Sequence, residues 1–429
     1  MRKAKTLAIF GLLIFRFLTK TYGQVSIDAE FRPRSEFMNG FNKPLLDTLN
    51  PAFITMQRTR ISFNYKSGNL NTSLVLQDSR VFGETGIKQH ASTLSGGVGV
   101  FEAWAELLLL SRTSFKIGRQ AVQFEDGRLF SSGNWGNTGK AHDLAQLIYF
   151  APDFNVQFAF ARNNQKPFYA DSSFYNISQM YKQLTFLHLQ KTFNARINLS
   201  LLGIDEGFEK AENNLGLYHR YTVGGTLQLM KDKLPYGFFA TSYYQFGKST
   251  ATVDLKAFLF AVTTNYSITN NFGIFTGIDY YSGSDPTLAP KKTNTWNKLP
   301  YGVNHSFNGY MEYWAVLPKG GLFNYFGGIN LNLTNKFCSK ITFYGFNLAK
   351  QMNADNQTIQ KNIGSELDLV FDYKFSEETA IQFAWCAYII TDGTRLLKYN
   401  STQVNTKFPQ YAYLMFTFKP KLYKTLQEK

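Results

Sequence analysis

The sequence predicts an all-β fold, a closed transmembrane antiparallel β-barrel of about 18 strands. Apolar and polar residues alternate with a period of two after residue 24, as in the runs that begin at Val25, Ile61 and Ile197, which is typical of strands with one apolar face. The segments between these runs alternate between tight turns and long connections, as in outer-membrane barrels. No run beyond the N-terminal leader reaches the roughly 18 to 20 apolar residues of a transmembrane helix.

The first residues resemble a secretory signal peptide. Arg2, Lys3 and Lys5 precede the apolar stretch 6–18, and Thr21-Tyr22-Gly23 supplies small residues before a cleavage site. A membrane anchor is the alternative, but the stretch is short and contains Arg16. We therefore expect a signal peptide at 1–23 and a single barrel domain at 24–429, exported to the outer membrane of a Gram-negative bacterium.

The composition excludes several classes of protein. The chain has 41 Phe and 25 Tyr but only 2 Cys, which is too few for a secreted disulfide scaffold. Abundant aromatic residues suit the girdles of a membrane barrel. The formal charge of +15 falls to about +10 without the five cations of the leader. Because an exported chain rarely meets nucleic acid, we expect anionic solutes, outer-membrane lipid and lipopolysaccharide as partners.

Periodicity places the strands along the whole mature chain, at 25–34, 55–66, 69–80, 100–110, 113–121, 142–151, 154–163, 178–190, 194–205, 217–230, 236–248, 251–267, 271–283, 321–333, 337–348, 362–374, 378–391 and 407–418. Long loops are expected at 35–54, 81–99, 122–141, 164–177, 206–216, 284–320, 349–361 and 392–406. Only 249–250 interrupts the alternation of long and short connections. An even number of strands places both termini on the periplasmic side.

A soluble β-sandwich is the alternative fold. It explains the period of two but not the alternation of loop lengths, and no linker marks the domain boundaries that so many strands would need. A closed barrel leaves no unpaired strand edge in lipid. The last strand ends on Phe418, the kind of aromatic end that barrel assembly machinery recognises, although 419–429 continues past it.

Two segments resemble the alginate export porin family. The first is Gln57-Arg58-Thr59-Arg60 with Leu76-Gln77-Asp78-Ser79-Arg80-Val81-Phe82-Gly83. The second runs from Glu102-Ala103-Trp104-Ala105-Glu106-Leu107 through Ile117-Gly118-Arg119-Gln120 and Asp126-Gly127-Arg128-Leu129 to Asn134-Trp135-Gly136-Asn137-Thr138-Gly139. The resemblance covers roughly 25–150. It implies a barrel of eighteen strands with loops that narrow the pore, and an arginine-lined lumen that passes an acidic polysaccharide.

Strand parity predicts which side chains face the lumen. The apolar faces of the first two strands point to lipid, so their polar faces place the following side chains inside: Asp28, Glu30, Arg32, Arg34, Arg58 and Arg60. Because the two strands are neighbours, we expect the four arginines to form one wall that attracts carboxylates. Arg196 and Arg220 have inward parity farther around the barrel.

Acidic residues share the predicted lumen, and the alternative is that Asp28, Glu30, Glu102 and Glu106 neutralise the arginines in ion pairs. On the strand 362–374, Glu366, Asp368 and Asp372 also have inward parity, so we expect a lining of mixed charge. The motifs add Arg119 and Arg128 to the pore-lining set, although the parity of Arg119 points toward lipid. The alternative for these two, and for Arg80 and Arg162, is to bind lipopolysaccharide phosphates at the outer rim. The resemblance to the alginate export porin family implies that the loop 122–141 folds into the lumen as a constriction, and the alternative is that it caps the barrel outside.

These observations predict a passive channel for anionic saccharides or polysaccharide, with a general-diffusion porin for small solutes as the alternative. An outer-membrane hydrolase and a purely structural barrel are further alternatives. The five histidines lie in no nucleophile or metal motif, and His142 and Asp143, being adjacent on a strand, point to opposite faces. We therefore expect no catalytic site, no metal and no cofactor.

Overall fold

The computed structural model describes residues 23–84, 97–164, 181–211, 214–229, 234–303, 305–354 and 357–425. The predicted signal peptide lies outside these residues apart from Gly23, as do most of the predicted loops 81–99 and 164–177. Strands make up most of the described chain: β1 (Gln24–Asn39), β2 (Ala52–Ser67), β3 (Leu70–Val81), β4 (Gly99–Leu110), β5 (Thr113–Gln120), β6 (His142–Phe150), β7 (Phe154–Arg162), β8 (Gln183–Phe193), β9 (Ile197–Ala211), β10 (Asn214–Leu229), β11 (Tyr236–Thr250), β12 (Val253–Ser267), β13 (Phe272–Tyr281), β14 (Lys292–Thr293), β15 (Leu322–Asn332), β16 (Phe337–Asn347), β17 (Asn353–Ala354), β18 (Gln357–Thr358), β19 (Asn362–Lys374), β20 (Thr379–Ile389), β21 (Gln410–Phe418) and β22 (Lys421–Lys424).

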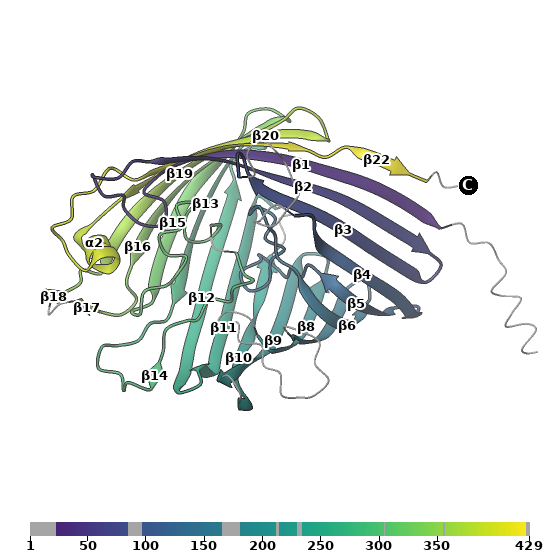
Figure 1. Ribbon diagram of the computed structural model, residues 1–429, viewed down its shortest axis with the longest axis horizontal. Coiled ribbons are helices and arrows are strands. Elements are labelled where there is room, and N and C mark those ends of the chain that lie inside the picture. The colour runs from purple at the N-terminus through teal and green to yellow at the C-terminus, as the bar shows by residue number, and fades with distance from the viewer. Residues whose placement is uncertain are drawn as a thin grey trace, which may run out of the picture.

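Eighteen of these strands form a closed antiparallel barrel (Figure 1). Each strand from β1 to β12 pairs with the next, and the ring continues from β13 through β15, β16, β19, β20 and β21. It closes where β21 pairs with β1, for example Leu414 with Ser35. Each of the predicted strands corresponds to one observed strand. The start of β1 and the short β22 lie at the same end of the barrel, as an even strand number requires.

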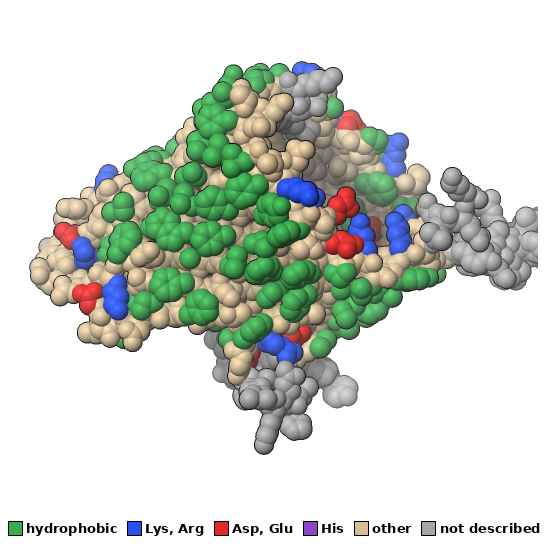
Figure 2. Space-filling model, turned by 90° about the horizontal axis from the view of Figure 1, so that it is seen from above, with side chains coloured by type: hydrophobic (Ala, Val, Ile, Leu, Met, Phe, Trp, Pro, Cys, Tyr) green, Lys and Arg blue, Asp and Glu red, His purple; other side chains and the backbone are tan. Residues whose placement is uncertain are grey.

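The outer face of the barrel is apolar because one parity of each strand points away from the interior. Phe63, Leu201 and Phe343 are among the side chains on this face, each at least two-fifths exposed. Figure 2 shows one outer wall, on which hydrophobic side chains form a broad area. A surface of this kind is stable against lipid acyl chains. No helix in the described part of the chain is both long and apolar enough to cross a bilayer.

One predicted connection differs from the structure. The segment 206–216 is not a long loop, because β9 continues to Ala211 and β10 begins at Asn214. The connection between β11 and β12 is a tight turn, as the short connection predicted at 249–250 requires, and both hairpins extend the sheet beyond the apolar band. The alternation of apolar and polar residues stops at 204–211 although the strand continues, because outward side chains there no longer face lipid.

A short helix, α2 (Asp392–Tyr399), lies in the predicted loop 392–406. Thr391 caps its first turn by accepting a hydrogen bond from the backbone N–H of Thr394 at 3.2 Å, and Asn400 ends it in the left-handed conformation. Lys398 on this helix donates a hydrogen bond of 2.5 Å to the backbone oxygen of Tyr313. The helix is therefore joined to the loop 282–321, which folds into the barrel.

Candidate functional site

The predicted arginine wall exists on β1 and β2. The register places Arg32 directly opposite Arg58 and Glu30 opposite Arg60, and Arg34 follows on the same face of β1. All four arginines are at least nine-tenths buried, with Arg58 only 1% exposed. Strand parity alone therefore located this cluster correctly, but these guanidiniums do not lie bare on the lumen surface.

The loop 121–141, here called the constriction loop, covers the arginines with its backbone. Arg32 donates to the carbonyl oxygens of Trp135 at 3.1 Å and Gly136 at 2.6 Å. Arg58 donates to the carbonyl oxygens of Asn134 at 3.0 Å and Gly136 at 2.9 Å. The loop thus folds inward as predicted, because buried guanidinium groups need acceptors and its carbonyls supply them.

Two of the four arginines are neutralised in ion pairs and two are not. Arg58 pairs with Glu30 at 2.5 Å, and Arg34 pairs with Glu36 at 2.6 Å. Among the described residues neither Arg32 nor Arg60 has a carboxylate within 4.0 Å. Arg60 instead donates to the Gln77 side chain at 2.7 Å and stacks on Phe101 at 3.8 Å. Ion pairing therefore neutralises Arg34 and Arg58 but not Arg32 and Arg60, so the arginine wall keeps an excess of positive charge.

The other end of the constriction loop is held at β13, away from the arginine wall. Arg128 donates to Asp279 at 3.0 Å and to the Tyr281 hydroxyl at 2.8 Å, and its guanidinium lies 3.9 Å from the centre of the Phe307 ring. Burial alone would lower the pKa of Arg128. The charge of Asp279 outweighs this effect, so the pKa of Arg128 lies above its usual value. Arg128 therefore lies in the lumen, as an anchor of the loop.

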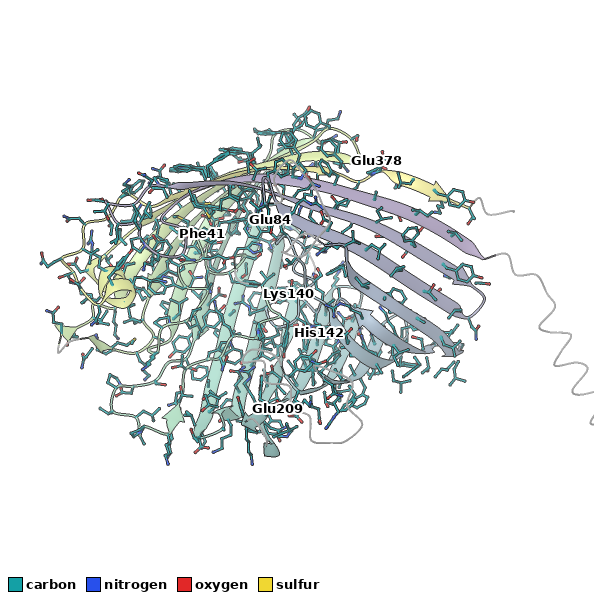
Figure 3. The ribbon with its side chains drawn as sticks, viewed as in Figure 1. Phe41, Glu84, Lys140, His142, Glu209 and Glu378 are labelled. Carbon is teal, nitrogen blue, oxygen red and sulfur yellow. The ribbon has the colours of Figure 1, made fainter. Side chains whose placement is uncertain are left out.

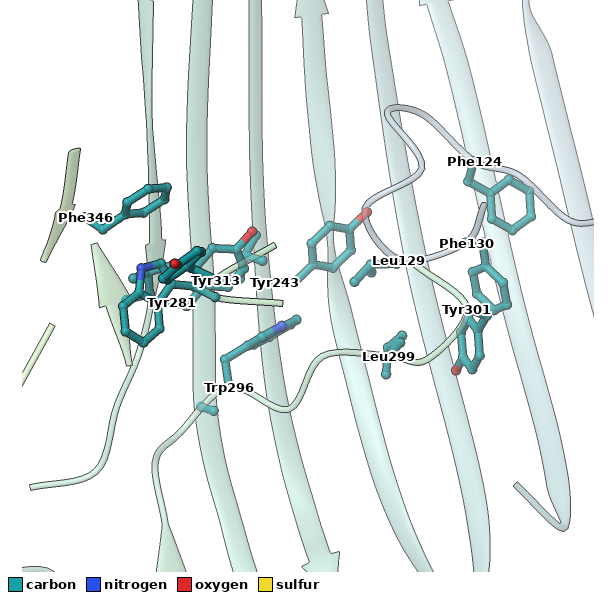
Figure 4. Packing of buried hydrophobic residues seen from close by; sticks show 14 of the residues in the cluster. Phe124, Leu129, Phe130, Tyr243, Tyr281, Trp296, Leu299, Tyr301, Tyr313 and Phe346 are labelled. Carbon is teal, nitrogen blue, oxygen red and sulfur yellow. The ribbon is translucent and has the colours of Figure 1, made fainter. Parts of the chain in front are cut away.

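A second loop, residues 282–321, packs against the constriction loop inside the barrel. The backbone N–H of Ser131 donates to Tyr301 at 2.9 Å, and that of Val303 donates to Gly127 at 3.0 Å. Gly302 fits closely here, since a Cβ on it would lie 2.2 Å from the Arg128 carbonyl oxygen. Figure 4 shows side chains of both loops packed beside the strand wall. The sequence pattern predicted this segment only as a long loop, with no place in the lumen. Its many aromatic residues were the available signal, since aromatic side chains tend to be buried.

The second loop is also attached to β19, through two carboxylates. Glu366 accepts a hydrogen bond of 2.8 Å from the backbone of Met311, and Asp368 accepts one of 3.2 Å from the backbone of Tyr310. His305 stacks on Trp135 with ring centres 4.2 Å apart. Burial lowers the pKa of His305 to about 3, so this imidazole is neutral. The two loops therefore form one packed unit across the lumen.

Several other predicted lumen residues lie on the inner face. Arg220 makes a bidentate ion pair with Glu206 at 2.7 and 2.8 Å. Glu106 accepts a hydrogen bond of 2.5 Å from Ser114, Glu102 accepts one of 3.0 Å from Trp104, and Asp28 accepts one of 3.4 Å from Ser26. The charged lining is therefore mixed in sign, as predicted.

Two predicted pore residues are corrected. Arg196 is not in a strand: it lies exposed in the turn 194–196, where Asn194 and Ala195 have positive φ. Arg119 faces outward, paired with Asp143 at 2.8 Å, because its parity on β5 is that of the lipid-facing Ile117. His142 is buried inside while Asp143 is exposed, so the two point to opposite faces as expected. Figure 3 marks His142 and Lys140 within the barrel.

Two cavities lie in the described part of the barrel on either side of the packed loops. One of roughly 700 Å³ is lined at the outer ends of β9 to β11 by Phe208, Tyr218 and Arg220, and by Trp296 and Lys298 of the second loop. The other, of roughly 650 Å³, is lined near the periplasmic ends of β12 to β19 by residues that include Asn265, Phe307, Asn330, Lys340 and Asp372.

No family model matches the sequence, and no curated protein matches it. Solved structures share the fold. OprD from Pseudomonas aeruginosa, described as an outer membrane protein, aligns with a TM-score of 0.59 at 11% identity, covering 93% of this chain and 94% of its own. OccAB2 from Acinetobacter baumannii aligns with a TM-score of 0.59 at 12% identity, covering 93% and 98%. OpdK from P. aeruginosa, solved with vanillate, aligns with a TM-score of 0.59 at 9% identity, covering 92% and 98%.

These likenesses confirm the fold, a closed barrel of eighteen antiparallel strands. The resemblance to the alginate export porin family finds no support among them, because the neighbours are porins of the OprD and Occ type. An alginate substrate therefore rests on the sequence motifs alone.

Proposed function

We propose that this chain is a passive channel of a Gram-negative outer membrane that passes small solutes and favours anions, including small acidic sugars. The observation that carries this proposal is the unneutralised charge of Arg32 and Arg60 beside the constriction loop. A fixed positive charge in a narrow lumen with low-dielectric walls raises the local concentration of anions and lowers that of cations. The solved neighbours are porins, and the ligand printed for one of them, vanillate, is a small organic anion.

The packing of the two loops favours small solutes over a polymer. Phe130 and Tyr301 stack across the loops with ring centres 4.7 Å apart, and Arg128 ties the constriction loop to β13. A polysaccharide would have to displace this packed unit along its whole length, whereas a small solute needs only a narrow path beside it. We therefore restrict the predicted cargo from polysaccharide to small anionic solutes.

Flux into proteoliposomes tests this function. We expect galacturonate to enter faster than galactose, because the two sugars are similar in size and differ in charge. An empty-liposome control measures leakage. Equal exclusion of both sugars, or faster entry of galactose, would contradict an anion-favouring channel.

A general-diffusion porin for small solutes is the second candidate. Carboxylates on the β13–β19 side of the lumen favour it, namely Asp279, Glu366, Asp368 and Asp372. Equal rates for galacturonate and galactose in the same assay would support this candidate, since passage would then depend on size alone.

A further inference from the structure

Two phenylalanine rings lie on the inner wall of the barrel, in the cavity of roughly 650 Å³ near its periplasmic end. Phe275 on β13 and Phe326 on β15 belong to neighbouring strands (Figure 1). The register places Phe275 directly opposite Gly328 and Phe326 directly opposite Gly277, so each ring has a glycine as its partner across the strands. We call the two rings the phenylalanine platform.

The platform lies against the wall because the residues opposite the rings have no side chain. A Cβ on Gly328 would lie 2.6 Å from the Phe275 ring, and a Cβ on Gly277 would lie 2.4 Å from the Phe326 ring. Each ring therefore occupies the space that a side chain of the opposite residue would fill. Both phenylalanines are only half-buried, so the platform offers an apolar aromatic surface to the cavity.

Polar groups surround the platform on the same face of the wall. Asn265 on β12 is directly opposite Phe275, and Asn330 on β15 is directly opposite Lys340 on β16. Lys340 extends along the wall, and its ammonium lies 4.8 Å from the centre of the Phe275 ring. Among the described residues, neither of these amides has a hydrogen-bond partner, and the ammonium has no carboxylate within 4.0 Å. All three polar groups line the cavity and can bind a solute.

A carboxylate lines the same cavity nearer to the periplasmic turn. Asp372 on β19 is directly opposite Cys338, two residues before Lys340 on β16, and it accepts a hydrogen bond of 2.7 Å from Gln382. A carboxylate of a solute is attracted to Lys340 and repelled by Asp372. Hydroxyl groups can donate to Asp372 and can bond with the two amides. The lining therefore suits a solute with several hydroxyl groups, one carboxylate and one apolar face.

We propose that the phenylalanine platform is a binding subsite for a hexuronate, a pyranose sugar that carries one carboxylate. The C–H groups on one face of a pyranose ring can pack on the negative face of an aromatic ring. The hydroxyl groups then bond with Asn265 and Asn330, and the carboxylate bonds with Lys340. A plain aromatic carboxylate would leave the amides without partners, which disfavours it. The proposal rests on the proposed function and names the sugar acid that the channel binds.

Block of the single-channel current by sugars, added on both sides of a planar bilayer, tests the proposal. Galacturonate should give half-maximal block at a concentration about tenfold lower than galactose, because its carboxylate adds a charge-assisted hydrogen bond. In Lys340→Gln this preference should disappear while the block by galactose stays the same. In Phe275→Leu both sugars should bind about fivefold more weakly, since the packing on the ring is lost.

The matched control is Lys256→Gln, which removes an exposed cation of outward parity on the neighbouring strand β12 and should behave as the wild type does. The heat-dependent gel shift of folded barrels verifies that each variant is folded. Unchanged block in Phe275→Leu would overturn the proposal, as would a galacturonate preference that survives in Lys340→Gln or is lost in Lys256→Gln. Benzoate that blocks as tightly as galacturonate would also overturn it, by assigning the platform to aromatic carboxylates.

The reversal potential in a potassium chloride gradient without sugar tests the proposed function by itself. An anion-selective channel that galacturonate does not block would contradict the hexuronate subsite alone. A cation-selective channel with the expected block would contradict the proposed function alone.

Discussion

The guanidinium of Arg128 lies 3.0 Å from the carboxylate of Asp279, and both side chains are buried inside the barrel. This pair joins one end of the constriction loop to β13, while carbonyls of residues 134–136 in the same loop accept hydrogen bonds from Arg32 and Arg58 on β1 and β2. The constriction loop is thus attached to two separate parts of the barrel wall. These two attachments hold the loop inside the lumen, which it narrows.

Removing one partner of this pair should destabilise the protein strongly. Asp279→Leu leaves the buried Arg128 charge with only the partly exposed Asp126, at 3.2 Å, as its partner, and breaking a buried ion pair costs about 3 to 5 kcal/mol in the free energy of unfolding. The double variant Arg128→Met/Asp279→Leu should recover most of that loss, because the buried charge of Arg128 is then removed as well. Urea unfolding in lipid vesicles measures both values. A double variant as unstable as the single one would contradict this account of the anchor.

Gly302 is expected to be essential to the contact between the two loops. In Gly302→Ala the new Cβ would lie 2.2 Å from the Arg128 carbonyl oxygen, so the loops must separate. We expect faster cleavage of the second loop by protease added to proteoliposomes and a larger single-channel conductance. Gly203→Ala is the matched control, since a Cβ there meets nothing within 4 Å. Equal behaviour of the two variants would exclude tight packing at Gly302.

Ion selectivity should depend on pH through Lys298, which lines the outer cavity. Burial, followed by the charge of Arg128, lowers the pKa of Lys298 to about 7. The side chain is therefore charged below that pH and neutral above it. The ratio of anion to cation permeability should fall as the pH rises from about one unit below this pKa to about one unit above it. In Lys298→Met this fall in the permeability ratio should be absent. A fall as large as that of the wild type would show that Lys298 is not the group that titrates.

Trp135 is expected to keep the constriction loop rigid. Its ring lies 4.4 Å from the Arg34 guanidinium and stacks on His305, so it joins the loop to the wall and to the second loop. Trp135→Ala should increase the noise of the open-channel current with little change in selectivity, because no charge is removed. Trp135→Phe keeps a stacking ring and should stay close to the wild type. Current noise that is the same in all three proteins would contradict this role.

The strands of the barrel could be predicted from the sequence because lipid imposes a period of two. Wherever one face meets acyl chains, as at Ile197 and Leu199, the alternation is visible. The signal disappears after residue 204, where β9 has left the apolar band, so residues 206–211 were wrongly predicted to be a loop. Arg196 was placed in a strand for a related reason, since alternation cannot show where a turn such as 194–196 ends.

The arginine cluster was predicted correctly, but its burial was not. Parity locates Arg32 and Arg58 on one face from local information, whereas the acceptors for both come from residues 134–136, about a hundred positions away for Arg32. The position of the second loop depends on equally distant contacts, such as that between Met311 and Glu366. Such contacts follow from the closed fold and leave no periodic signal in the sequence.

The reversal potential in a salt gradient across a planar bilayer tests the central claim most directly, because it reports which ion the constriction favours. The wild type should be anion-selective, and Arg32→Gln/Arg60→Gln should lose most of that selectivity, since these two arginines carry the unneutralised charge of the wall. Arg80→Gln, which changes an outward-facing arginine on β3, should leave the potential unchanged. A cation-selective wild type, or full anion selectivity in the double variant, would contradict the account.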